Sequence, residues 1–195
     1  MTSPALVVRG IVKRFGNHVA VDGISFEVPR GCVYGILGPN GAGKSTTLRM
    51  INDIIAPDAG EISILDGLKP GGEAAARIGY LPEERGLYPK MRVVEMIAYL
   101  GELRGLAAGD ARARANKWLD RLGLAQWAKA RVQDLSKGMQ QKVQFAACAL
   151  HEPELLILDE PWSGLDPINA EVLRDVVAEI RASGRTVLFS THQME

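Results

Sequence analysis

The sequence is short of the features that define several common protein classes. It has only two cysteines in 195 residues and no excess of either charge, because 23 Lys and Arg balance 23 Asp and Glu. Cys32 and Cys148 are far apart and each lies in an apolar run. We therefore interpret both as buried thiols and exclude a disulfide framework or a cysteine metal site. The neutral charge gives no electrostatic footprint for nucleic acid, which is not expected as a partner.

Long apolar runs are also missing. No stretch approaches the ~20 residues that span a bilayer, and the opening MTSPALVVRG lacks the pattern of a secretory leader. The sequence therefore predicts a cytoplasmic protein, for which any role at a membrane requires a partner. The length suits one well-buried domain.

Short apolar runs alternate with helical patterns, which is typical of an α/β fold. Ile24, Phe26 and Val28 alternate with Ser25 and Glu27, as in a strand with one wet face. Three later runs are continuously apolar, which predicts central parallel strands covered on both faces. These runs are CVYGIL (32–37), LLIL (155–158) and TVLF (186–189).

The stretch 89–150 interrupts this alternation. It is rich in Ala, Arg, Leu and Lys and has no strand-like runs. We expect three or four helices there, beginning near Val93, near Asp110 and at Ser136. The last of these predicted helices has one apolar face at helical spacing, formed by Met139, Val143, Ala146, Ala147 and Leu150.

The segment GPNGAGKST fits the phosphate-loop pattern G-x-x-x-x-G-K-[ST] and lies between an apolar run and a helical pattern. Glycines let backbone N–H groups surround phosphate oxygens, and a helix N-terminus adds positive potential. Lys44 would reach the β- and γ-phosphates of ATP, and the Ser45 hydroxyl would bind Mg²⁺. A Gly-rich turn with a chance lysine is the alternative. The predicted ATP-binding loop consists of Gly38, Pro39, Asn40, Gly41, Ala42, Gly43, Lys44, Ser45 and Thr46.

The segment LLILDEP presents two carboxylates at the end of a buried strand. Ligands bind at this end of the strands in open α/β sheets. Asp159 is expected to hold Mg²⁺, and Glu160 to polarise the attacking water as general base. The alternative is an ordinary strand exit with acidic turn residues.

The order of GPNGAGKST, LSKGMQQK, LLILDEPWSGLDP and STH resembles the nucleotide-binding subunit of ATP-binding cassette (ABC) transporters over essentially the whole chain. The resemblance implies a P-loop NTPase core with a mostly parallel sheet, an N-terminal antiparallel β subdomain and a helical insert. It divides the single domain 1–195 into a core, 1–88 and 151–195, and a helical part, 89–150.

The resemblance also implies an activity, MgATP hydrolysis, and partners. Two such subunits, most simply a homodimer, enclose ATP and Mg²⁺ between them and power a separate membrane permease from the cytoplasmic face. The LPEERGLYP wording resembles the ATP-binding proteins of sodium and drug exporters. Family domains normally continue after the STH motif, so the C-terminal part of the family domain is expected to be missing here.

The segment LSKGMQQK matches the family signature LSGGQ, which contacts the ATP held by the opposing subunit. Ser136 and Gly138 carry over, and a helix starting there would aim its dipole at the γ-phosphate. Ser136 is also a good helix N-cap, and both roles are compatible. Lys137 and Met139 depart from the usual Gly and Gln, which leaves the detailed contact open.

Four further positions acquire roles by resemblance. Asp166 matches an interface loop of the dimer, although Asp-Pro is also a favourable helix start. His192 matches a histidine that contacts the γ-phosphate. Glu83 occupies the place of a glutamine that binds Mg²⁺ and senses the permease. Phe15 matches an aromatic that stacks on adenine, with packing on the core as the alternative.

Other functions remain open at this point. The same cassette occurs in soluble proteins of translation and DNA repair, which usually carry two cassettes or a long coiled coil. This sequence has one cassette and no sustained heptads. An ATPase acting alone is the third possibility, in which the signature segment has no obvious use.

Overall fold

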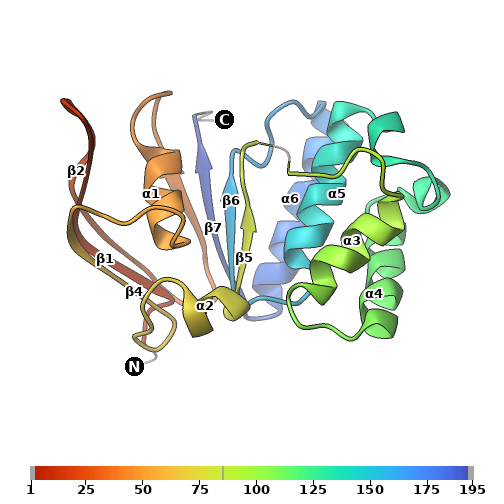
Figure 1. Cartoon of the computed structure of the whole chain (residues 1–195), viewed down its shortest axis with the longest axis horizontal. Coiled ribbons are helices and arrows are strands. Elements are labelled where there is room, and N and C mark those ends of the chain that lie inside the picture. The colour runs from red at the N-terminus through yellow and green to blue at the C-terminus, as the bar shows by residue number, and fades with distance from the viewer. Residues whose placement is uncertain (1–2, 85, 193–195) are drawn as a thin grey trace.

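The computed structural model describes residues 3–84 and 86–192. The ends of the predicted domain and Arg85 of LPEERGLYP lie outside the described residues. Figure 1 shows an antiparallel sheet at one side, a parallel sheet in the centre and a group of helices at the other side. This arrangement confirms the predicted α/β fold with an antiparallel β part and a helical part.

The antiparallel sheet contains three strands among the described residues, in the order β2-β1-β4. Their bounds are Leu6–Phe15 for β1, His18–Val28 for β2 and Ala59–Ile64 for β4. In β2, Val28 is buried whereas Ser25 and Glu27 are exposed, which confirms the predicted strand with one wet face.

The parallel sheet contains four described strands in the order β3-β7-β6-β5. Their bounds are Val33–Leu37 for β3, Ile78–Leu81 for β5, Leu155–Asp159 for β6 and Thr186–Thr191 for β7. Strand β6 is buried along its whole length. Leu156 and Leu158 face one apolar cluster, and Leu155 and Ile157 face the other. The prediction of strands covered on both faces is therefore confirmed for LLIL.

The prediction of a covered central strand is wrong for β3. Within the described residues β3 pairs only with β7 and forms the edge of the sheet. Its side chains are only partly covered, with Val33 40% and Leu37 58% exposed. Cys32, just before β3, is partly exposed, so its prediction as a buried thiol is also wrong, whereas Cys148 is buried. An apolar run alone does not distinguish an edge strand from a central one.

The helices fall into two groups. Helix α1 packs between the two sheets, and helices α3 to α6 cover the other face of the parallel sheet (Figure 1). The bounds are Lys44–Ile51 for α1, Gly72–Arg77 for α2, Val93–Glu102 for α3, Ala108–Arg121 for α4, Lys137–Ala149 for α5 and Pro167–Ala182 for α6. Two short 3₁₀ turns, Ala125–Trp127 and Val132–Asp134, precede α5. None of the helices in the described ranges is long and apolar enough to cross a bilayer.

The helical stretch contains three α-helices, as predicted. Helices α3 and α5 begin at the expected places, and α4 begins two residues before Asp110. Helix α5 differs from the expected one-sided helix, because every residue from Gln141 to Ala149 is buried. The helices share one apolar cluster with the parallel sheet, and the boundaries at 88 and 150 remain an interpretation.

Candidate functional site

The loop between β3 and α1 forms a cradle of backbone groups. Gly43 has a φ of 81°, and a Cβ there would lie 2.2 Å from the carbonyl oxygen of Ala20, so only glycine fits. Gly41 also has a positive φ, with open space where its Cβ would be. Among the described residues no side chain caps the N-terminus of α1. The first N–H groups of this helix have no partner within the helix and can bind an anion.

Lys44, the first residue of α1, is folded back over this loop. Its ammonium group donates to the carbonyl oxygens of Gly38 at 2.8 Å and Pro39 at 3.1 Å. It also lies 3.6 Å from Oε1 of Glu160, and both side chains are at least nine-tenths buried. The lysine therefore holds a positive charge directly above the cradle.

Asp159 and Glu160 follow one another at the carboxyl end of β6. Asp159 is 1% exposed and accepts a hydrogen bond of 2.5 Å from the Ser190 hydroxyl on β7. The backbone N–H of Glu160 donates to Oγ and to the carbonyl oxygen of Ser190, at 3.2 Å each. Glu160 has a φ of 49°, a strained conformation for a residue with a side chain. The chain turns at Glu160, which separates the two carboxylates.

The Glu160 carboxylate is only partly paired. Its Oε2 lies 2.9 Å from Nδ1 of His192. Its Oε1 is buried and has no hydrogen-bond partner among the described residues; the ammonium group of Lys44 is near but too distant for such a bond. A buried, unpaired carboxylate oxygen is costly unless another group approaches it. The arrangement leaves a polar position between the lysine and the carboxylate.

A cleft of about 410 Å³ opens over these groups. Glu160, the loop residues 40–46, Glu83 and Phe15 all contribute to its wall. Phe15 is 51% exposed at the rim, which does not favour its packing on the core. The structure thus brings together groups from four segments distant in the sequence, and their individual roles stay predictions.

Asp159, His192, Gly38 and Pro39 adjoin or contact residues of this cleft but are not part of its wall, and Ser136, Gly138 and Asp166 lie in other segments outside it. The Ser136 hydroxyl accepts from the N–H of Met139 at 3.2 Å, and Asp166 accepts from the N–H of Asn169 at 2.9 Å, so both residues cap helices. The second bond lowers the pKa of Asp166. A Cβ on Gly138 would lie 3.3 Å from the Leu165 side chain. The signature segment therefore packs against the SGLDP segment, and any contact with ATP stays a prediction.

The oxygen groups at this site have the character that Mg²⁺ prefers. The predicted ligands are the Ser45 hydroxyl and the carboxylates of Asp159 and Glu83, all hard oxygen donors. Within residues 3–84 and 86–192, no three His, Cys, Asp or Glu side chains cluster closely enough to enclose a metal. Mg²⁺ keeps several waters and phosphate oxygens, so a sparse set of protein ligands fits it better than a closed cage.

Three polar residues that support the site are not among the predicted site residues. Ser190 binds Asp159, as described above. Gln141 donates to the carbonyl oxygen of Pro161 at 3.3 Å, and Gln144 donates to the carbonyl oxygens of Pro82 and Glu84. Polar residues within the apolar stretch of α5 were the available signal, because buried polar groups need partners.

Comparisons with known proteins agree with this geometry. The family model described as "ABC transporter" matches residues 21–163. The ABC transporter ATP-binding protein YhaQ of Bacillus subtilis is 46% identical over 97% of the chain and 63% of its own length. The Nod factor export ATP-binding protein I of Ralstonia nicotianae is 40% identical over the whole chain and 61% of its own length.

A solved structure of an ATP-binding subunit of an ABC transporter superposes with a TM-score of 0.86 at 32% identity, covering 96% of this chain and 79% of that one. The two relatives are longer, and the chain spans less than two thirds of either. The predicted resemblance to exporter-type ATP-binding proteins is confirmed. From its phosphate loop, its fold and these matches, the chain belongs to the ABC transporter family, as an ATP-binding domain of the P-loop NTPase type.

Proposed function

We propose that this domain binds and hydrolyses MgATP as the ATP-binding part of an ABC exporter. One observation carries the proposal. Lys44 and Glu160 stand 3.6 Å apart, buried, above an uncapped helix N-terminus, and one carboxylate oxygen has no hydrogen-bond partner among the described residues. A phosphate group in this position would receive the lysine charge and the loop N–H groups.

ATP binding rearranges the contacts of Lys44. Its bonds to Gly38 and Pro39 are exchanged for bonds to the β- and γ-phosphate oxygens, so the ammonium group stays paired. The Ser45 hydroxyl and Asp159 would hold Mg²⁺, and Glu83 would complete this set from its own loop. Bound Mg²⁺ supplies charge neutralisation of the phosphates.

Glu160 then acts on the attacking water. Its Oε1, which accepts no hydrogen bond among the described residues, takes the proton of a water aligned with the γ-phosphate, as a general base. His192 holds the other oxygen at 2.9 Å, and this bond fixes the carboxylate orientation. The His192 ring is partly exposed, so a γ-phosphate can approach it, and a ring that carries both N–H groups would donate to Glu160 and to a γ-phosphate oxygen together.

The partner surfaces belong to the same proposal. Ser136 and Gly138 do not line their own cleft, so a second subunit packed head to tail would bring them to the opposing ATP, with Asp166 at the interface. A permease would dock on exposed apolar side chains that follow residues 82–84, which we call the Glu83 loop. Among them are Tyr88 and Tyr99, whose rings lie 6.1 Å apart and which are 51% and 39% exposed. The domain would then work at the cytoplasmic face of a membrane.

The soluble alternatives receive no support. Neither the family match nor the relatives described above point to translation or DNA repair. The relative named for Nod factor export favours transport out of the cell.

Titration of the purified domain with a fluorescent ATP analogue and Mg²⁺, followed by phosphate release, tests the proposal. We expect saturable binding that Lys44→Ala removes, because the buried ammonium group over the loop is lost while the loop glycines remain. Thr46→Ser serves as a conservative control in the same loop and should still bind. Equal binding by wild type and Lys44→Ala would refute the assigned phosphate site.

A further inference from the structure

Gln144 lies on helix α5 and hydrogen-bonds to the backbone of the Glu83 loop, residues 82–84. Its side chain is 6% exposed. Its Nε2 donates to the carbonyl oxygens of Pro82, at 3.3 Å, and Glu84, at 3.2 Å. These two carbonyls belong to the residues on either side of Glu83. The side-chain amide of Gln144 therefore binds the main chain on both sides of the predicted Mg²⁺ ligand, and both N–H donors of this amide are used.

The same helix also contacts the segment that carries the general base. Gln141, three residues earlier and 3% exposed, donates to the carbonyl oxygen of Pro161, which directly follows Glu160. Residues three apart lie on neighbouring positions of a helix surface. Helix α5 begins next to Ser136 of the signature. One rigid element thus joins the signature, the Glu83 loop and the carboxyl end of β6.

The Gln144 contact is also incomplete. Its Oε1 is buried and has no hydrogen-bond partner among the described residues. An unpaired buried acceptor costs free energy, which makes this contact weaker than a fully paired one. Such a contact can be broken and remade when the loop moves, unlike a saturated network.

We propose that Gln144 is a positioning residue, which sets the Glu83 loop for Mg²⁺ and links its position to helix α5. The effect on Mg²⁺ rests on the proposed function, in which Glu83 binds this ion with ATP. The contact with the loop does not depend on it. Gln144 itself reaches no reacting atom and acts only through the backbone at Pro82 and Glu84.

Two measurements on the Gln144→Met protein test the proposal. The first is hydrogen exchange at the amides of Glu83 and Glu84 without nucleotide, which we expect to accelerate about tenfold because the loop loses both anchors. The second is the Mg²⁺ concentration that half-saturates binding of a fluorescent ATP analogue. We expect this concentration to rise about tenfold, with little change in binding of the analogue without Mg²⁺.

Gln140→Met is the matched control. Gln140 lies on the same helix and also donates to two backbone carbonyls, those of Val132 and Leu135, both far in sequence from the Glu83 loop. The Gln140→Met change therefore removes two hydrogen bonds from a side-chain amide to backbone carbonyls, as Gln144→Met does. We expect hydrogen exchange at the Glu83 amide without nucleotide to keep its wild-type rate in this variant.

Gln144→Glu keeps the shape of the side chain but turns a carboxylate toward two carbonyl oxygens. It should show the same two effects, and it carries the test if the methionine variant does not fold. Wild-type values of exchange and of Mg²⁺ half-saturation in a folded Gln144 variant would overturn the proposal. Wild-type protein without any Mg²⁺-dependent binding would instead refute the proposed function, while the exchange data would still decide whether Gln144 holds the loop.

Discussion

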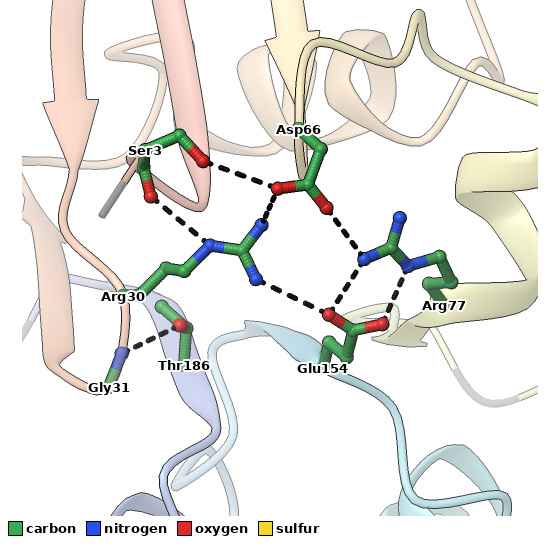
Figure 2. Close-up of polar contacts among 7 residues, drawn as sticks. All are labelled: Ser3, Arg30, Gly31, Asp66, Arg77, Glu154 and Thr186. Carbon is green, nitrogen blue, oxygen red and sulfur yellow. Dashed lines mark hydrogen bonds and ion pairs between the residues drawn. The ribbon is translucent and has the colours of Figure 1, made fainter. Parts of the chain in front are cut away.

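Two clusters of charged side chains lie at opposite ends of strand β6 and are built differently. Glu154 directly precedes the strand and belongs to an ion network with Arg30, Asp66 and Arg77 (Figure 2). Glu160 directly follows the strand and belongs to the candidate site. The two glutamates have the same side chain and flank the same strand, so their surroundings account for the difference.

The network at the amino end is open and fully connected. Arg77 donates to Glu154 through Nε at 2.6 Å and through Nη2 at 2.8 Å, and to Asp66 at 3.0 Å. Arg30 also donates to both carboxylates, to Asp66 at 2.6 Å and to Glu154 at 3.4 Å. The hydrogen bonds from Arg77 are the main reason why the pKa of Asp66 and of Glu154 is lowered. These contacts join β4, α2 and β6, and with them the two sheets.

The cluster at the carboxyl end is buried and incompletely paired. Glu160 has a strained backbone, one oxygen on His192 and one oxygen without a hydrogen bond in the described structure. Buried groups left partly satisfied cost stability and are found where a ligand or a reaction uses them. In this comparison the fully paired cluster ties the two sheets together, whereas the incompletely paired cluster lies at the proposed catalytic site.

Exchanging each glutamate for glutamine tests this difference most strongly. Glu160→Gln should lower ATP turnover by about 100-fold or more, because the amide cannot accept the proton of water. ATP should still bind, and an ATP-bound dimer should accumulate. Phosphate release and gel filtration with ATP measure both effects.

Glu154→Gln is the matched control at the other end of the same strand. It should keep turnover within about twofold and lower the melting temperature, because the fork from Arg77 loses its charged acceptor. A Glu160→Gln protein that hydrolyses ATP at the wild-type rate would show that Glu160 is not the base. A loss of turnover in Glu154→Gln as large as in Glu160→Gln would remove the proposed division between the two ends.

A smaller effect is expected at the exposed rim of the cleft. Phe15→Ala should weaken ATP binding by about 5- to 150-fold, which corresponds to the ~1–3 kcal/mol of base stacking on an aromatic ring. Turnover at saturating ATP and the melting temperature should change little, because Phe15 belongs to neither charged cluster. Binding of inorganic triphosphate, which has no base, is the control and should be unaffected. Unchanged ATP affinity would return Phe15 to a purely structural role.

The sequence predicted the parts of this site that are local. The phosphate loop, the buried strand before Asp159 and the caps at Ser136 and Asp166 depend on neighbouring residues, and all were found where expected. The edge position of β3 depends on which strands pair with it, and periodicity does not contain this information. Gln144 and Ser190 were missed for a related reason, since their partners are more than 30 residues away.

The amino-end network gives the smallest and most specific effect. Arg77→Met removes the donor shared by Asp66 and Glu154, and the melting temperature at neutral pH should fall by about 2–4 °C, since exposed ion pairs contribute little individually. Both carboxyl pKa values are lowered in the folded protein. The stabilisation from these ion pairs is therefore fully present at a pH above the ordinary carboxyl pKa values, 3.8 for Asp66 and 4.5 for Glu154. It is lost as the pH falls through the lowered pKa values of the folded protein. Thermal unfolding of wild type and Arg77→Met across this range should converge at acidic pH, and a constant difference would show that Arg77 stabilises the fold by packing and not by charge.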